Sequence, residues 1–79
     1  MSEETLFLSA KQTLYQISKN LKALRNQYGY TQSYVAQQLG IRYQSYHAYE
    51  TGLTVPTLEN FIKLAKLYDV SLDDLIESV

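Results

Sequence analysis

The chain contains no cysteine, a single histidine and only three glycines among its 79 residues. Without cysteine it can form neither a disulfide nor a thiolate metal site, and a reducing cytoplasm is the natural setting. One histidine, His47, leaves no second ligand for a metal centre and no partner for an activated nucleophile. The three glycines stand singly, so they do not make a phosphate-cradling loop. We therefore expect no enzyme, no metal, no cofactor and no small-molecule ligand.

Long apolar runs are also absent. The first eleven residues, MSEETLFLSAK, carry two acids and an apolar run too short for a signal peptide, and no segment reaches membrane-spanning length. A chain of 79 residues fits one domain, and a set of helices is the economical way to close a core of that size. We expect a soluble, cytoplasmic, all-α protein without a membrane partner.

Two short helices joined by a tight turn are predicted within residues 31–52, TQSYVAQQLGIRYQSYHAYETG. The first runs over about residues 32–39 and places Val35 and Leu39 one turn apart on the same face. Gly40 ends it, because glycine adopts the left-handed conformation without a Cβ penalty. The chain can then turn back toward the core.

The second of these helices is predicted over about residues 43–51. It buries Tyr46 and Tyr49, which are three residues apart. Its opposite face then carries few charges and several hydrogen-bonding groups, on Tyr43, Gln44, His47 and Ala48.

This pattern resembles the helix-turn-helix of the Xre/Cro and phage lambda-repressor family of DNA-binding domains. Residues 21–29, LKALRNQYG, resemble the family's first helix, and residues 55–75 resemble its fourth and fifth. The resemblance implies a compact five-helix, lambda-repressor-like domain over residues 18–79, preceded by an N-terminal extension over residues 1–17.

The resemblance also implies which residues contact DNA. Gln32 would bind a backbone phosphate and brace the recognition helix, and Gln44 would read a base, since a carboxamide pairs in two places with adenine. Arg42 stands where the family commonly has a capping serine or threonine, and it would reach a phosphate instead. The expected DNA-binding residues are Thr31, Gln32, Arg42, Tyr43, Gln44, His47, Ala48 and Thr51.

Arg25 and Glu50 resemble a pair that joins the family's first helix to the end of its third. Glu50 is the only acid near the motif and follows the apolar Tyr49. The resemblance therefore implies a structural ion pair that holds the recognition helix without touching DNA. Two solvated surface charges are the alternative.

Charge is unevenly distributed along the chain. Residues 5–49 hold five basic residues and no acid, whereas residues 50–79 hold six acids and two lysines. Local potential rather than net charge steers association, so the acid-free part would face phosphates. Chance segregation of a few charges is the alternative.

The segment after the second helix departs from the family pattern. The family often has basic residues at the positions of Leu53, Thr54 and Val55, so we expect a modest affinity for DNA.

The N-terminal extension carries an apolar heptad pattern at alternating spacings of 3 and 4 residues. Ser9 and Gln12 form a capping-box pattern, so we expect a long first helix that begins near Ser9. Its first half either associates with a symmetric partner or folds back on its own domain or frays. The pattern comprises Phe7, Ala10, Leu14, Ile17, Leu21, Leu24 and Tyr28.

The last third of the chain is predicted to form two further helices. Thr57 and Ser71 stand at N-cap positions, and Ser71 has Asp74 three residues on. The first apolar stripe is Leu58, Phe61, Ile62, Ala65 and Tyr68, and the second is Leu72, Leu75, Ile76 and Val79. Both stripes are core or interface, and the candidate dimerisation residues are Phe7, Leu14, Ile17, Leu72, Leu75, Ile76 and Val79.

The function implied is that of a transcriptional regulator, most simply a repressor, that binds double-stranded DNA as a homodimer. One recognition helix would enter each half-site of an inverted-repeat operator, with centres about 34 Å apart. A phage-type immunity regulator, a small chromosomal regulator and an antitoxin-like autorepressor all fit the pattern. A protein-interaction module that uses the tyrosine-rich surface is the alternative of a different class.

Overall fold

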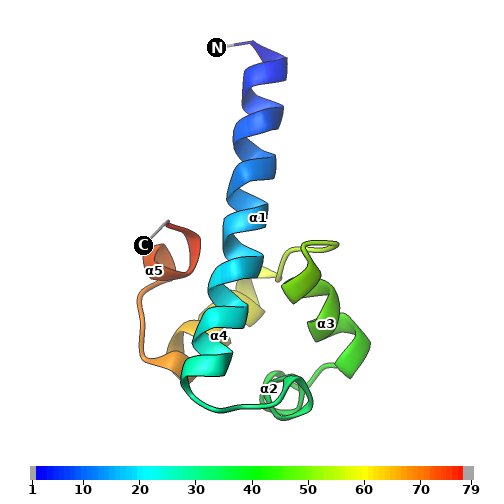
Figure 1. The fold of residues 1–79 in the computed structure, drawn as a ribbon, viewed down its shortest axis with the longest axis vertical. Coiled ribbons are helices and arrows are strands. Elements are labelled where there is room, and N and C mark those ends of the chain that lie inside the picture. The colour runs from blue at the N-terminus through cyan, green and yellow to red at the C-terminus, as the bar shows by residue number, and fades with distance from the viewer. Residues whose placement is uncertain (1, 78–79) are drawn as a thin grey trace.

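The computed structural model describes residues 2–77, and these form five helices without a strand (Figure 1). The predicted all-α, five-helix architecture is confirmed. The helices are α1 (Glu3–Gln27), α2 (Gln32–Leu39), α3 (Tyr43–Thr51), α4 (Leu58–Tyr68) and α5 (Leu72–Ile76). No helix within these residues is long and apolar enough to span a bilayer.

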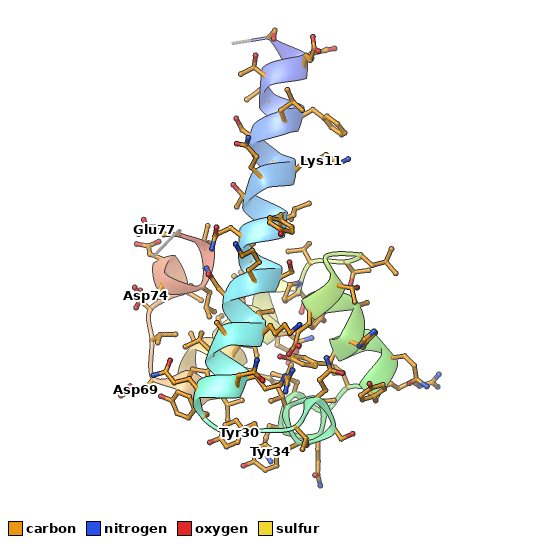
Figure 2. All side chains as sticks on the ribbon, in the orientation of Figure 1. Lys11, Tyr30, Tyr34, Asp69, Asp74 and Glu77 are labelled. Carbon is orange, nitrogen blue, oxygen red and sulfur yellow. The ribbon has the colours of Figure 1, made fainter. Side chains whose placement is uncertain are left out.

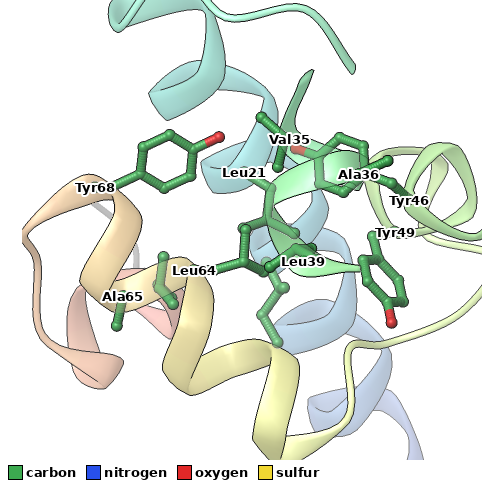
Figure 3. Close-up of a cluster of buried hydrophobic side chains, with 11 residues drawn as sticks. Leu21, Val35, Ala36, Leu39, Tyr46, Tyr49, Leu64, Ala65 and Tyr68 are labelled. Atoms are coloured by element: carbon green, nitrogen blue, oxygen red, sulfur yellow. The ribbon is translucent and has the colours of Figure 1, made fainter. Parts of the chain in front are cut away.

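The hydrophobic core lies between the C-terminal half of α1 and the four shorter helices (Figures 1 and 3). Helix α3 packs against both α1 and α2, and α5 packs against α1 and α4. Burial of one large apolar side chain stabilises a fold by about 1.5–3 kcal/mol. The buried apolar residues are Ile17, Leu21, Val35, Ala36, Leu39, Tyr46, Tyr49, Leu64, Ala65, Tyr68 and Leu75.

The boundaries of α2 and α3 follow from their caps, as the sequence predicts. The hydroxyl of Thr31 accepts a hydrogen bond from the backbone N–H of Tyr34 at the start of α2. Gly40 ends α2 with a φ of 72°, and Gly52 ends α3 with a φ of 79°. These left-handed conformations are strained for residues with a Cβ, so glycine fixes the sharp turns around α3.

The N-terminal helix is longer than predicted. It begins at Glu3 rather than near Ser9, because the hydroxyl of Ser2 accepts from the backbone N–H of Thr5 and the acids Glu3 and Glu4 stand in the first turn. Its 25 residues span about 37 Å at the standard rise. The first half projects away from the other helices instead of folding back on them (Figure 1).

The apolar stripe predicted for α4 lies only partly in the core. Leu58 and Ile62 are 69% and 40% exposed, whereas Asn60 and Leu64 are buried. The sequence pattern missed this face because Asn60 interrupts it with a polar side chain. The caps at Thr57 and Ser71 are confirmed, and Ser71 forms a capping box with Asp74.

The set of candidate dimerisation residues also needs correction. Ile17 and Leu75 are 5% and 0% exposed, so they belong to the core of their own chain and cannot form a dimer surface. Leu72 and Ile76 are 39% and 38% exposed. Val79 lies outside the described residues.

Candidate nucleic-acid interface

A buried carboxylate at the end of α3 connects three helices. Glu50 has a side-chain exposure of 3%, and it accepts hydrogen bonds from Arg25 Nε at 2.6 Å and Arg25 Nη2 at 3.0 Å. This two-point contact fixes the guanidinium and the carboxylate in one plane, which a single hydrogen bond would not do. The pair therefore sets how α3 sits against α1.

Two further side chains complete this cluster. The hydroxyl of Tyr46 donates to Glu50 Oε2, and Gln32 Nε2 donates to Glu50 Oε1 at 3.0 Å. Burial alone would raise the pKa of Glu50, but the hydrogen bonds from Arg25, Tyr46 and Gln32 outweigh it and hold this pKa below the ordinary value. The pKa of Tyr46 is raised by burial and by its bond to Glu50. We call Arg25, Gln32, Tyr46 and Glu50 the Glu50 cluster.

Gln32 also links the Glu50 cluster to the exposed face of α3. Its Nε2 donates to Glu50, so its Oε1 is left to face His47 Nδ1 at 3.2 Å. A carboxamide oxygen can only accept, so this contact requires the proton of His47 to sit on Nδ1. His47 Nε2 is then the ring nitrogen left for an outside partner, and it is an acceptor when the imidazole is neutral.

The outward face of α3 is a polar, solvent-facing surface. Tyr43 is 46% exposed, and its ring stacks on His47 with centroids 5.8 Å apart and planes 19° apart. Gln44 is exposed and Ala48 is half-buried beside it. These residues share one helix face, and we call Tyr43, Gln44, His47 and Ala48 the recognition face.

A shallow groove runs beside the recognition face. It is lined by Gln44, Ser45, Ala48, Tyr49, Thr54 and Val55, so the chain that follows α3 forms its far wall. Thr51 is at the edge of this region, where its hydroxyl donates to the backbone oxygen of Ala48 at 3.2 Å. Thr51 thus stabilises the last turn of α3, and its hydroxyl oxygen can still accept.

The N-terminus of α3 differs from that of the other helices. Arg42 occupies its N-cap with an extended backbone and no side-chain hydrogen bond to the helix. Its long exposed side chain therefore remains available beside Tyr43. A capping hydrogen bond ordinarily stabilises a helix by about 1 kcal/mol, and α3 lacks one. The position of α3 therefore depends more on the Glu50 cluster.

The basic charge near α3 is smaller than the sequence suggests. Arg25 is committed to Glu50 and also donates to the backbone oxygen of Tyr30 at 3.0 Å, so its charge is neutralised inside the domain. Lys11 extends from the projecting half of α1 (Figure 2), where it lies over the ring of Phe7 at 5.3 Å. Arg42 remains as the basic side chain that begins α3.

Three acidic residues of the second half, unlike Glu50, lie away from α3. Figure 2 shows Asp69, Asp74 and Glu77 on one side of α1, around α5, with α3 on the other side. The charge asymmetry along the chain is therefore also an asymmetry in space. A negatively charged partner would meet less repulsion at α3 than at α5.

Two buried amides support the site, and neither was predicted from the sequence. Asn60 Nδ2 donates to the hydroxyl of Tyr49 at 3.0 Å, which ties α4 to α3. Asn20 Nδ2 donates to the backbone oxygens of Leu75 and Glu77, which ties α1 to the end of α5. An asparagine inside an otherwise apolar stripe was the available signal, because buried polar groups are usually paired.

The site contains no arrangement typical of a metal centre. Within residues 2–77, no three His, Asp or Glu side chains lie close enough together to hold a metal ion. The polar side chains around α3 are hydrogen-bonding groups on a convex helix surface. They suit contact with another extended polar molecule.

Comparison with known proteins agrees with this geometry. Residues 21–75 match the family model described as helix-turn-helix. The solved structure of a transcriptional regulator from Listeria innocua superposes with a TM-score of 0.76 at 30% identity, covering 81% of this chain and 60% of that one.

Named relatives are similar over the same part of the chain. The transcriptional repressor RstR of the cryptic phage CTXphi in Vibrio cholerae is 37% identical over 59 residues, which are 75% of this chain and 53% of that protein. The uncharacterised HTH-type transcriptional regulator YqaE of Bacillus subtilis is 42% identical over 60 residues, or 76% of this chain and 52% of the relative. The chain thus spans about half the length of the curated relatives it matches. It belongs to the Xre and lambda-repressor-like helix-turn-helix family.

Proposed function

We propose that this protein is a transcriptional regulator that binds double-stranded DNA in a sequence-specific manner, with α3 in the major groove. The observation that carries this proposal is the pairing of a clamped helix with an exposed polar face. The Glu50 cluster fixes the buried side of α3, while Tyr43, Gln44 and His47 point away from the core. A rigid helix that presents few polar groups is what base readout requires.

Each residue of the interface has a distinct role in this proposal. Gln44 pairs with the N6 and N7 of an adenine, and Tyr43 lays its ring on a thymine methyl or donates to a phosphate. His47 uses its free Nε2 on a base or a phosphate. Arg42, Thr31 and Gln32 contact the DNA backbone at the N-termini of α2 and α3, where backbone N–H groups favour an anion.

The protein acts as a homodimer on an inverted-repeat operator in this proposal. A two-fold protein dimer places one α3 in each of two half-sites about 34 Å apart. Repression by occlusion of a promoter is the regulatory outcome that we propose, and it is supported by the similarity to a relative that is named as a repressor. Its setting is the bacterial cytoplasm.

Selection from random duplex DNA tests the proposal directly. Purified protein is presented with the library at about 0.1 M salt, where nonspecific phosphate contacts are already partly screened. Enrichment of an inverted repeat is the expected result. A library that remains unenriched while circular dichroism shows a folded protein would overturn the proposal.

A protein-interaction role is favoured by one separate observation. Tyr28, Tyr30, Tyr34 and Tyr68 form a ring cluster with centroids 4.6–6.2 Å apart. Tyr28 and Tyr34 are 41% and 39% exposed, and tyrosine is enriched in protein interfaces. An antitoxin-like autorepressor would combine this surface with DNA binding. Nonspecific duplex DNA would not displace a protein partner bound through these rings, whereas it would compete with DNA bound at α3.

A further inference from the structure

The projecting half of α1 presents an uncovered apolar seam. We call residues 3–16 the arm. Phe7 and Leu14 are 60% and 39% exposed there, and Leu6 beside them is 55% exposed. With Ala10 they continue the heptad face that Ile17 and Leu21 bury in the core further along the same helix. A contiguous apolar face on a helix that stands clear of its domain marks an interaction site.

We propose that the arm pairs antiparallel with the arm of a second copy of this chain. This inference supplies the dimer interface of the proposed function and rests on the homodimer in it. A second copy is the occupant because the seam and the charges beside it are complementary to themselves. An interface of this kind is isologous, as a two-fold dimer requires.

The extent of the free seam determines both orientation and register. From Ile17 onward, the domain's own core covers this helix face. In a parallel pair, the two domains would therefore lie beside each other at the same end of the paired arms. An antiparallel partner places the two domains at opposite ends. The heptad positions of the arm run from Glu3 to Leu14, and their apolar side chains are Phe7, Ala10 and Leu14. Full antiparallel overlap sets Phe7 opposite the partner's Ala10 and leaves Leu14 at each end, beside the partner's Glu3.

The charges of the arm select the same register independently. Glu4 and Lys11 are seven residues apart, so they flank the seam on the same side of the helix. In the antiparallel overlap, Glu4 lies beside the partner's Lys11, and the two-fold axis repeats the contact. A parallel pair in register would place neither residue beside its opposite charge. Flanking charges of this kind set the orientation of paired helices.

The position of Lys11 also suits this contact. Its ammonium lies over the ring of Phe7, 5.3 Å from the centroid, so it is already at the edge of the seam.

The paired segment is about three helical turns long, so we expect a weak dimer whose formation depends on protein concentration. Two adjacent half-sites on DNA would raise the effective concentration of the second copy and complete the pairing.

Sedimentation of the full chain without DNA tests the seam. Wild-type protein is expected to shift from monomer to dimer as its concentration rises, and Phe7→Gln is expected to remain monomeric. The matched control is Leu8→Gln, because Leu8 is 53% exposed but points away from the seam. Both side chains are exposed, so circular dichroism should show the same helix content for all three proteins.

Charge reversal tests the register. Glu4→Lys and Lys11→Glu each turn two attractions into two repulsions, so each should weaken dimerisation about tenfold. The double variant Glu4→Lys/Lys11→Glu restores both pairs and should recover wild-type affinity. Lys19→Glu changes the net charge as Lys11→Glu does, but Lys19 lies beyond the arm, over the ring of Tyr15, and the variant should dimerise normally.

Three results would overturn the inference. They are a wild-type chain that stays monomeric at every concentration, equal losses in Phe7→Gln and Leu8→Gln, or a double charge variant that is no better than the single ones. Because DNA is absent from these measurements, failure of the arm would leave base readout by α3 untouched. Failure of the random-duplex selection would in turn leave the self-association result intact.

Discussion

Arg25 and Glu50 are separated by 25 residues in the chain but are joined by hydrogen bonds of 2.6 and 3.0 Å, with side-chain exposures of 13% and 3%. This pair connects α1, which carries the arm, to α3, which carries the recognition face. A buried ion pair with good geometry adds little net stability but strongly penalises loss of one partner. Its main consequence is therefore a fixed orientation of α3.

Glu50→Ala should lower the free energy of unfolding by about 3–5 kcal/mol, because Arg25 would remain inside the domain without its counter-charge. Urea denaturation measures this change. Glu59→Ala is the matched control, since Glu59 pairs with Lys63 at 3.5 Å on the exposed surface of α4. That loss should be below about 1 kcal/mol. Equal losses in the two variants would contradict a structural role for Glu50.

Stability should fall in acid through the same carboxylate. The pKa of Glu50 is lower in the folded chain than the ordinary 4.5, so the unfolded chain takes up the proton first as the pH falls. The contribution of Glu50 is therefore complete above pH 4.5 and is lost as the pH falls through the folded pKa. Glu50→Gln should show a flatter decline in unfolding free energy between about pH 5 and 3. An unchanged slope would show that other carboxylates carry the acid sensitivity.

Tyr49→Phe should destabilise the domain by about 1–3 kcal/mol, because it leaves the buried Asn60 amide without the hydroxyl that accepts its hydrogen bond at 3.0 Å. Thermal unfolding followed by circular dichroism measures the loss. Tyr15→Phe removes the same atom from a side chain that is 65% exposed and should leave the midpoint unchanged. If the two variants melt together, the contact between α3 and α4 has no energetic role.

The helix-turn-helix core was predictable because its signals are local. Thr31 and Gly40 bound α2 through their own backbone chemistry, and Gly52 ends α3, so both helices have the predicted limits. The start of α1 was not predictable in the same way. Ser9 and Gln12 imitate a helix start, yet continuing the helix back to Ser2 gains further backbone hydrogen bonds.

Apart from the Arg25–Glu50 pair, which the family resemblance implied, long-range polar contacts were the part that the sequence did not specify. Nothing in the spacing of Gln32 and Glu50 shows that Gln32 binds this carboxylate, because that contact depends on how α2 crosses α3. Likewise, the charge pattern counted Arg25 among the residues facing phosphates, whereas the structure neutralises it with Glu50. Periodicity predicts which face a residue occupies, and tertiary packing decides what that face meets.

Base readout by Gln44 from a clamped α3 is measured by the binding of Gln44→Ala to the selected operator and to its single-base variants. We expect a loss of about 1–3 kcal/mol that is confined to one base pair of each half-site. Gln27→Ala is the control, because Gln27 lines a cleft near α5 together with Asp74 and Glu77. This variant should leave the affinities for the operator and its single-base variants unchanged. Equal weakening across every sequence, or no weakening at all, would contradict base readout by α3.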